Sequence, residues 1–338
     1  MNYEPLISNL SISGIPEFAR FELGEKALAR AIHAAGIDFE SIADQQVFVP
    51  QSAILRFVEA TARAAGEENL GLMLTPAMDI AGYGLWSDYL LGANSLGQAL
   101  ESTVRTIGFH STGDTVSITL AGDQVRFAYR LALAGHTGYQ HASCAAAGLV
   151  QSICRRYTSN AWKPSKIELD IARPRRGSPF EDVFQCPVTY DAPCVTVVFD
   201  RHYLTAGRLG RQPKKTVTIE DVARFTRGGA PEDLLGTIAE QIRLQVFLGS
   251  TSIVSAAQLI GTSVRTLQRE LNRAGTDFRT MANAVRTQRA MELLRHGNTS
   301  ITRISSELGY SAPAHFARAF RKATGLSPRE YRSTVRKI

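Results

Sequence analysis

The sequence predicts an α+β N-terminal domain followed by an all-α C-terminal domain, in which two helix-turn-helix units are joined by a long helix. Two observations lead to this fold class. Apolar residues recur with helical spacing in much of the first 200 residues, but strict alternation replaces it over residues 115–131. The last ninety or so residues contain an internal repeat with helical spacing only. We therefore expect domains at residues 1–205 and 233–338, joined by a connection at residues 206–232 that is rich in Gly, Pro and charge.

The elements of the N-terminal domain follow from the same periodicities. Gly36 and Gly66 are typical helix stops, and Ser95 is a plausible N-cap. Alternation on both sides of Gly122 predicts a β-hairpin. We expect helices at residues 18–36, 50–66, 95–110 and 141–157, hairpin strands at 115–120 and 124–131, short strands at 166–171, 188–190 and 194–199, and a helix at 233–249 that leads into the repeat.

Charge is distributed unevenly along the chain. Residues 250–338 hold 15 Lys and Arg against 5 Asp and Glu, whereas the rest holds 23 against 26. A nearly neutral body with one basic end indicates a polyanionic partner, and a nucleic acid fits it best; the repeat described below specifies double-stranded DNA. A solvated basic surface is the alternative that charge alone leaves open.

The bulk composition excludes several other classes. The 338 residues are 44% apolar and 20% charged, which is ordinary for a globular protein of two or three domains. The start has no basic segment before an apolar run, and no segment is apolar for long enough to span a bilayer. We therefore expect a cytoplasmic protein with no membrane partner.

Cysteine and histidine spacing gives no sign of a metal or cofactor site. No pair of cysteines forms C-x-x-C, so buried reduced thiols are expected, with a redox-sensing pair as the alternative. The histidines of the N-terminal domain show no helical i, i+4 pair, which argues against a metal site. The residues concerned are Cys144, Cys154, Cys186, Cys194, His110, His136 and His141.

The repeat near the C-terminus consists of "IVSAAQLIGTS" and "ITRISSELGYS", which match with an offset of 48 residues. After the turn the offset becomes 49, so that Leu267 and Leu271 correspond to Phe316 and Phe320. Each copy reads as a short helix, a tight turn at Gly, a Ser cap and a second helix, which is the helix-turn-helix pattern. A helical pair that only packs on other helices is the alternative. We call residues 252–274 the first module and residues 300–324 the second module.

The second helices of the two modules, at residues 263–274 and 312–324, have an apolar and a polar face. Val264, Leu267 and Leu271 are expected to face inward in the first module, and Phe316, Ala319, Phe320 and Ala323 in the second. Arg suits guanine and Gln suits adenine in the major groove, while Ser, Thr and Lys reach phosphates. The candidate DNA-binding residues are Ser263, Arg265, Thr266, Gln268, Arg269, Ser311, Ala314, His315, Arg318 and Lys322, and Asn272 lies on the same outward stripe.

Between the modules, residues 278–296 carry an apolar stripe that predicts one long helix. A helix of about 17 residues is roughly 25 Å long. It would hold the two recognition helices near the ~34 Å repeat of B-DNA, so that they enter successive major grooves on one face.

The C-terminal part resembles the AraC/XylS family of bacterial transcription regulators. The resemblance covers about residues 251–332 and rests on "SVRTLQREL", "VRTQRAMELL" and "ITRISSELGYSAPAHFARAFRKATGLSPREYR" in that order. Ser305 stands where the family more often has Ala. Ala314 and His315 occupy positions that contact bases in relatives, so the base preference of those relatives is not carried over to this chain. The resemblance implies a transcription factor, with activation as the expected sign and RNA polymerase as a partner.

The N-terminal part is similar to the arabinose-binding-like sensor domain of one branch of that family, which includes ornithine-utilisation-type regulators. This resemblance rests on "NLGLMLTPAMDIAGYGLWSDYLLGANSLGQALE", the hairpin and "IELDIARPRRGSPFEDVFQCPVTYDAPCVTVVFD". It implies a small-molecule effector, whose identity the label does not establish, and a homodimer formed through the N-terminal half.

Two clusters are candidate effector contacts. Tyr83, Trp86 and Tyr89 lie in a glycine-rich segment and offer apolar walls with polar tips, but they also suit an aromatic core. Arg126 and Arg130 share one face of the hairpin and suit a carboxylate or phosphate, but they also suit an exposed strand face.

Two further functions compete with an effector-controlled regulator. Alkylation-repair proteins join this helix-turn-helix to a methyl-accepting cysteine in a Pro-Cys-His-Arg site, but the cysteines here stand in "FQCPV" and "APCVT". A structural DNA-binding protein without a signal would not need some 230 residues of nearly neutral α+β domain. We therefore expect a regulator rather than an enzyme.

Overall fold

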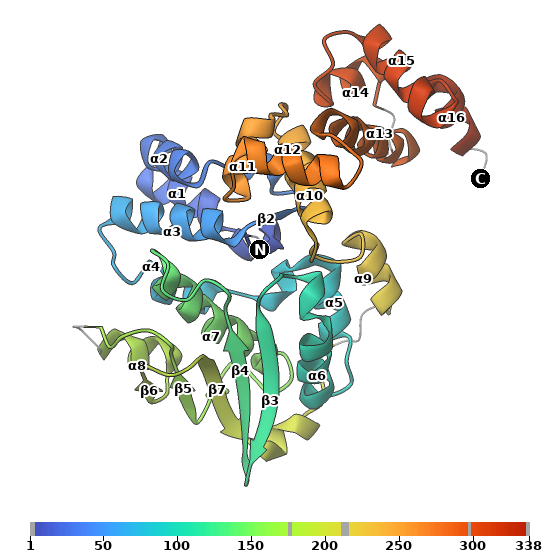
Figure 1. Cartoon of the computed structure of the whole chain (residues 1–338). Coiled ribbons are helices and arrows are strands. Elements are labelled where there is room, and N and C mark those ends of the chain that lie inside the picture. The colour runs from blue at the N-terminus through green and yellow to red at the C-terminus, as the bar shows by residue number, and fades with distance from the viewer. Residues whose placement is uncertain (1–3, 175–177, 211–215, 297–298, 336–338) are drawn as a thin grey trace. The chain divides into compact units, whose positions relative to one another are not determined.

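The computed structural model describes residues 4–174, 178–210, 216–296 and 299–335 (Figure 1). Contacts divide the chain into two compact units. Unit 1 comprises chiefly the residues from Pro231 onward together with Val47–Val49, and unit 2 comprises Pro5–Gln46 and Pro50–Ala230. Unit 2 combines helices with a sheet, and unit 1 is built almost wholly of helices, which confirms the predicted fold class.

A five-stranded sheet with the strand order β3-β4-β7-β5-β6 forms the centre of unit 2. β3 and β4 make the predicted hairpin, seen as two long adjacent arrows in Figure 1, with Val116 opposite Tyr129 and Ile118 opposite Phe127. β7 pairs antiparallel with β4 and β5, whereas β5 and β6 pair in parallel. The strands of unit 2 are β3 Thr115–Ala121, β4 Gln124–Arg130, β5 Lys166–Glu168, β6 Val188–Thr189 and β7 Val195–Asp200, and two short strands, β1 Leu6–Ser8 and β2 Phe48–Pro50, precede them.

Helices α6 and α7 contact this sheet and bury its inner face. The predicted helices at residues 50–66, 95–110 and 141–157 are confirmed as α3, α6 and α7, and Ser95 caps α6 by accepting from the backbone N–H of Gln98. The helices of unit 2 are α1 Ile15–Leu23, α2 Glu25–Ala35, α3 Gln51–Ala65, α4 Leu70–Leu74, α5 Gly84–Leu91, α6 Leu96–Thr106, α7 Tyr139–Arg155, α8 Ser178–Phe184 and α9 Ile219–Phe225.

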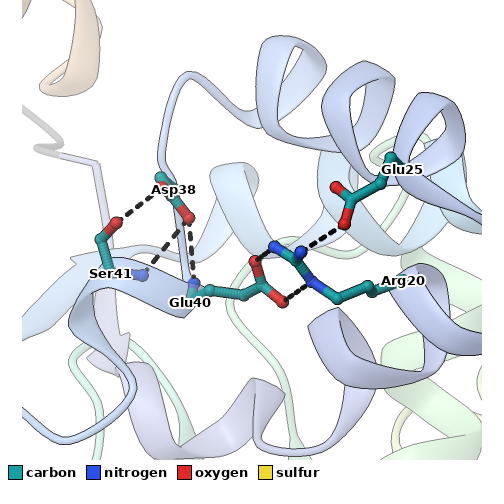
Figure 2. Close-up of polar contacts among 5 residues, drawn as sticks. All are labelled: Arg20, Glu25, Asp38, Glu40 and Ser41. Carbon is teal, nitrogen blue, oxygen red and sulfur yellow. Dashed lines mark hydrogen bonds and ion pairs between the residues drawn. The ribbon is translucent and has the colours of Figure 1, made fainter.

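The single helix predicted at residues 18–36 is wrong, because two helices meet at Gly24. This glycine has a φ of 86°, a conformation that side-chain-bearing residues avoid, and it separates α1 from α2. Figure 2 shows how Arg20 of α1 joins the neighbouring segments, with its guanidinium on the carboxylates of Glu40 and Glu25. Asp38 accepts hydrogen bonds from the backbone of Glu40 and from Ser41, which fixes the loop that presents Glu40.

The predicted connection at residues 206–232, of which 211–215 lie outside the described residues, contains a helix that the sequence pattern did not indicate. A capping box between Thr218 and Asp221 begins α9. Val222 is fully buried in the same core as the sheet, and α9 contacts α5. This part of the connection is therefore packed on unit 2.

Unit 1 encloses a second core. Its long helix α13 has 19 residues, which corresponds to about 28 Å, and it contacts α10, α15 and α16. The predicted helix at residues 233–249 is confirmed as α10, with Asp233 as the N-cap. The helices of unit 1 are α10 Leu234–Phe247, α11 Ile253–Leu259, α12 Val264–Arg273, α13 Phe278–His296, α14 Ile301–Glu307, α15 Pro313–Thr324 and α16 Pro328–Val335.

A buried ion pair between Glu240 and Arg243 lies on helix α10 of unit 1. The Oε1 atom of Glu240 accepts a hydrogen bond of 2.9 Å from the backbone N–H of Phe48. The guanidinium of Arg243 lies 3.7 Å from the other carboxylate oxygen of Glu240 and 3.4 Å from Glu292 of α13. Because Glu240 and Arg243 are both buried, each compensates the charge of the other in a place that water does not reach.

Candidate nucleic-acid interface and ligand cavity

The two modules of unit 1 repeat the same local geometry. Ser252 caps α11 and Ser300 caps α14 through their side-chain oxygens, at the predicted offset of 48 residues. Gly261 and Gly309 follow with φ values of 72° and 75°, which turn the chain into the second helix of each module. The second helices are α12 and α15 (Figure 1). The predicted helix-turn-helix pattern is therefore present twice.

Each second helix has one buried and one exposed face. Leu267, Leu271, Phe316 and Phe320 are buried in the core of unit 1, as expected, whereas Ala323 is exposed and its predicted inward position is wrong. Because α15 ends at Thr324, Ala323 lies in the last turn, beyond the contact with the core. Of the ten candidate DNA-binding residues all but the half-buried Thr266 are exposed: Ser263, Arg265, Gln268, Arg269, Ser311, Ala314, His315, Arg318 and Lys322.

The starts of α12 and α15 differ. Ser263 caps α12 by accepting a hydrogen bond of 3.1 Å from the backbone N–H of Thr266. In α15 the N-cap is Ala312, which has no capping side chain, and Pro313 occupies the first turn. The predicted cap at Ser311 is therefore wrong; its hydroxyl lies 3.1 Å from Nδ1 of His315 instead.

The two candidate guanine-reading arginines have different surroundings. Arg269 lies 3.2 Å from the carboxylate of Glu270, which also binds Arg273 at 2.8 Å. Desolvation acts to raise the pKa of Glu270, but the hydrogen bonds from these two arginines outweigh it, so that the pKa is lowered. Arg318 makes no hydrogen bond or ion pair with any residue that the structure describes. Arg318 is therefore free to bind a ligand, whereas Arg269 must first leave Glu270.

In unit 2 the candidate effector residues occupy three different environments. Tyr83 and Trp86 are buried at the start of α5, and Tyr89 is half-buried on the same helix. The indole N–H of Trp86 donates a 2.9 Å hydrogen bond to Thr106. Arg126 pairs with Glu168 across the sheet, and exposed Arg130 donates to the carbonyl of Pro193. The aromatic residues and the arginines therefore form no common site.

A cavity of about 390 Å³ lies within unit 2 and includes Tyr83 in its wall. Its walls are mostly Ile, Leu, Val, Ala and Met side chains from the segment before α1 and from α3, α4, β4 and α7. Three ring-bearing polar residues that the sequence did not assign to a ligand site also line it, namely His110, Tyr129 and His141, together with Ser11, Ser13 and Asp79. Tyr129 belongs to strand β4 of the hairpin, whereas His110 and His141 come from distant segments.

The side chains of His110, Tyr129 and His141 in this wall are uncharged at neutral pH. The ring of His110 stacks on Trp86 at 4.8 Å, and desolvation lowers the pKa of His110 to about 3. Tyr129 donates a 2.9 Å hydrogen bond to Asp114, whose pKa burial raises. Desolvation also lowers the pKa of His141, and its Nδ1 atom accepts from the backbone N–H of Gly71 at 3.2 Å.

Three of the four cysteines lie in surroundings that do not favour a thiolate. Cys144, Cys154 and Cys186 are buried, and Cys194 is half-buried. Desolvation raises the pKa of Cys144 to about 12 and that of Cys186 to about 11, so both thiols stay protonated at neutral pH. Within the described ranges no group of three or more His, Cys, Asp or Glu is arranged to hold a metal ion. Among the helices of these ranges, none combines the length and the apolar character that crossing a membrane needs.

Comparison with known families gives two matches. The model described as "Arabinose-binding domain of AraC transcription regulator, N-term" matches residues 27–207, which is more than half of the chain. The model described as "Helix-turn-helix domain" matches residues 256–334. Apart from Val47–Val49 of unit 1, the first match falls on unit 2, and the second match falls on unit 1.

Individual relatives are also transcription regulators by name. The chain is 29% identical to the HTH-type transcriptional regulator VqsM of Pseudomonas aeruginosa over 46% of this chain and 49% of that protein, so it spans about half of this relative. It is 24% identical to the Ornithine utilization regulator of Pseudomonas aeruginosa over 79% of each chain. Among solved structures, the transcriptional regulator CdpR from Pseudomonas aeruginosa aligns with 78% of this chain and 86% of its own, at 21% identity and a TM-score of 0.37.

Proposed function

Because the chain belongs to the AraC family of transcription regulators, we propose that it binds specific DNA sequences through unit 1 and that a small molecule bound by unit 2 controls this activity. One observation carries the proposal. Two helix-turn-helix modules occur in tandem, and each presents an exposed helix face that carries Arg and other hydrogen-bonding side chains. This arrangement is what recognition of successive major grooves requires.

On this proposal α12 and α15 are the recognition helices, and each candidate residue has a role set by its chemistry. Arg269 and Arg318 bind guanine through their paired N–H groups, and Gln268 binds adenine. Ser263, Ser311 and Lys322 contact phosphates and fix the register of the protein on the duplex. The remaining candidates, Arg265, Thr266, Ala314 and His315, border these contacts on the same exposed faces.

Three further properties belong to the proposal through family membership alone. Transcription activation through RNA polymerase is proposed, as are a homodimer formed by the N-terminal half and a cytoplasmic location. The protein is proposed not to be an enzyme, and the protonated thiols of Cys144 and Cys186 support this by lacking the nucleophilic form that methyl transfer needs.

The proposal is tested by footprinting the full chain on the promoter region beside its own gene, at moderate salt. We expect protection of two segments about one helical turn apart on one face of the duplex. Equal affinity for this region and for a scrambled duplex of the same composition would sink the proposal, since sequence-independent phosphate binding alone produces that result.

Arg318→Ala and Arg269→Ala are each expected to weaken binding to the specific site by about 1–3 kcal/mol. The loss should be larger for Arg318, because Arg269 gives up its contact with Glu270 when it binds DNA and so gains less. Fluorescence anisotropy with specific and scrambled duplexes at one salt concentration measures both effects. Arg329→Ala, an exposed arginine on α16 outside the recognition helices, is the matched control and should affect both duplexes equally. Unchanged specific affinity in both variants would refute the groove assignment.

A further inference from the structure

Two buried residues in the wall of the 390 Å³ cavity carry polar side-chain groups that have no hydrogen-bond partner among the residues that the structure describes. These groups are the hydroxyl of Tyr83, a residue that is 8% exposed, and the ring nitrogens of His110, which is 4% exposed. Of the other ring-bearing residues nearby, Trp86 donates to Thr106 and Tyr129 donates to Asp114, whereas Nε2 of His141 makes no hydrogen bond within the described part of the chain and lies 3.4 Å from the carboxylate of Glu59. Buried polar groups are nearly always hydrogen-bonded, so an unpartnered pair at a cavity surface indicates a missing partner in the cavity.

The two groups lie close together. The rings of Tyr83 and His110 are 5.2 Å apart, and the stack on Trp86 holds the imidazole in place. The tyrosine hydroxyl donates and accepts, and the neutral imidazole offers one donor and one acceptor. A hydroxyl or carbonyl group on a ligand is complementary to the hydrogen-bonding groups of both residues.

The cavity offers no compensation for a charged ligand. Its lining contains no Lys or Arg, and desolvation keeps both His110 and His141 neutral at pH 7. Its one acidic residue, Asp79, pairs with Arg156 and accepts from the backbone N–H of Ala81. A carboxylate or an ammonium group would be buried here without a counter-charge, which is costly. A sugar would also fit poorly, because most of its hydroxyls would face Ile, Leu, Val and Ala side chains.

We propose that this cavity binds an uncharged, mainly apolar molecule with a single hydroxyl or carbonyl group, which Tyr83 and His110 hold by hydrogen bonds. The apolar body lies against the side chains of α3 and α7. The statement that this ligand is the effector rests on the proposed function. The statement that the cavity binds such a ligand does not rest on it, because binding is measured without DNA.

The test compares ligands that share one apolar chain and differ only in the head group. Isothermal titration calorimetry of the full chain at pH 7 is run with 1-octanol, octanoate, octylamine and L-arabinose. We expect 1-octanol to bind, octanoate and octylammonium to bind roughly tenfold more weakly or worse, and L-arabinose to give no binding heat. No binding of 1-octanol, or tighter binding of either ion or of the sugar, overturns the proposal.

Two variants locate the site. Tyr83→Phe removes only the hydroxyl and should weaken the binding of 1-octanol by roughly three- to tenfold. Tyr203→Phe, in the same unit but outside the cavity wall, is the matched control and should bind as the unchanged protein does. Ala145→Phe, in the α7 wall, should fill the space and abolish binding. Thermal unfolding of each variant verifies the fold; if Tyr83→Phe and Ala145→Phe fold and bind 1-octanol unchanged, the assignment is wrong.

The DNA assay separates the two proposals. If 1-octanol binds as expected but no duplex is bound selectively, the proposed function fails and the cavity assignment stands. If DNA is bound selectively but the alcohol is not, the cavity assignment fails and the regulator stands.

Discussion

Replacing Phe316 by Ala is expected to lower the free energy of unfolding of unit 1 by about 3–5 kcal/mol. Phe316 is 1% exposed and belongs to a row of packed rings. Its ring centroid lies 5.5 Å from that of Tyr310, before α15, and 5.7 Å from that of Phe320, which lies 5.5 Å from Tyr331 of α16. Removing one ring from the middle of this row leaves a cavity and breaks two aromatic contacts.

Urea unfolding followed by two signals measures this effect on the correct unit. Both tryptophans of the chain, Trp86 and Trp162, lie in unit 2, so their fluorescence reports only that unit. Far-UV circular dichroism reports the helices of both units. Phe316→Ala should shift the circular dichroism transition of unit 1 and leave the fluorescence transition unchanged.

Arg318→Ala is the natural comparison because it lies on the opposite face of the same helix. An exposed residue with no partner among the described residues should change stability by no more than about 0.5 kcal/mol. Phe316→Ala should therefore lose stability and DNA binding together, whereas Arg318→Ala should lose binding only. If Phe316→Ala leaves the unit 1 transition in place, the ring row does not anchor α15.

The repeat in the sequence predicted most of unit 1. It also explains why the cap predicted at Ser311 was wrong. The offset changes from 48 to 49 residues between Gly309 and α15, so the second module has one extra residue in its turn. Counted at 49, the residue that corresponds to Ser263 is Ala312 and not Ser311. The helix therefore begins one residue later than the Gly-to-Ser spacing indicates.

The site in unit 2 was less predictable. The aromatic segment around α5 was identified, but whether its rings belonged to a core or to a cavity depends on tertiary packing. Tyr83 lines the cavity, whereas Trp86 is buried behind His110 and bonded to Thr106. His110 follows α6, a location that no local pattern connects with α5. Spacing along the chain carries no information on such contacts, because they depend on how distant segments fold together.

Replacing Glu240 by Ala is expected to lower the free energy of unfolding of unit 1 by about 3–5 kcal/mol. The change leaves Arg243 buried, with Glu292 at 3.4 Å, and it removes the acceptor of the Phe48 N–H. A buried charge that loses a partner, and a buried donor that loses its acceptor, each cost the free energy of taking that group out of water. Glu240→Gln keeps an acceptor for Phe48 and removes only the charge, so it should cost less.

The same two-signal urea experiment measures these variants, with Glu232→Ala as the matched control because Glu232 is exposed just before α10. Hydrogen exchange at the Phe48 amide provides a second, local measurement. Val47–Val49 belong to unit 1, although the residues on both sides belong to unit 2. The Phe48 amide should therefore exchange slowly in the unchanged protein and in Glu240→Gln, and fast in Glu240→Ala, since a donor without an acceptor exchanges as soon as water reaches it. If Glu240→Ala keeps this amide protected, the carboxylate does not fix the segment to α10, and any loss of stability must come from the contact of Glu240 with Arg243.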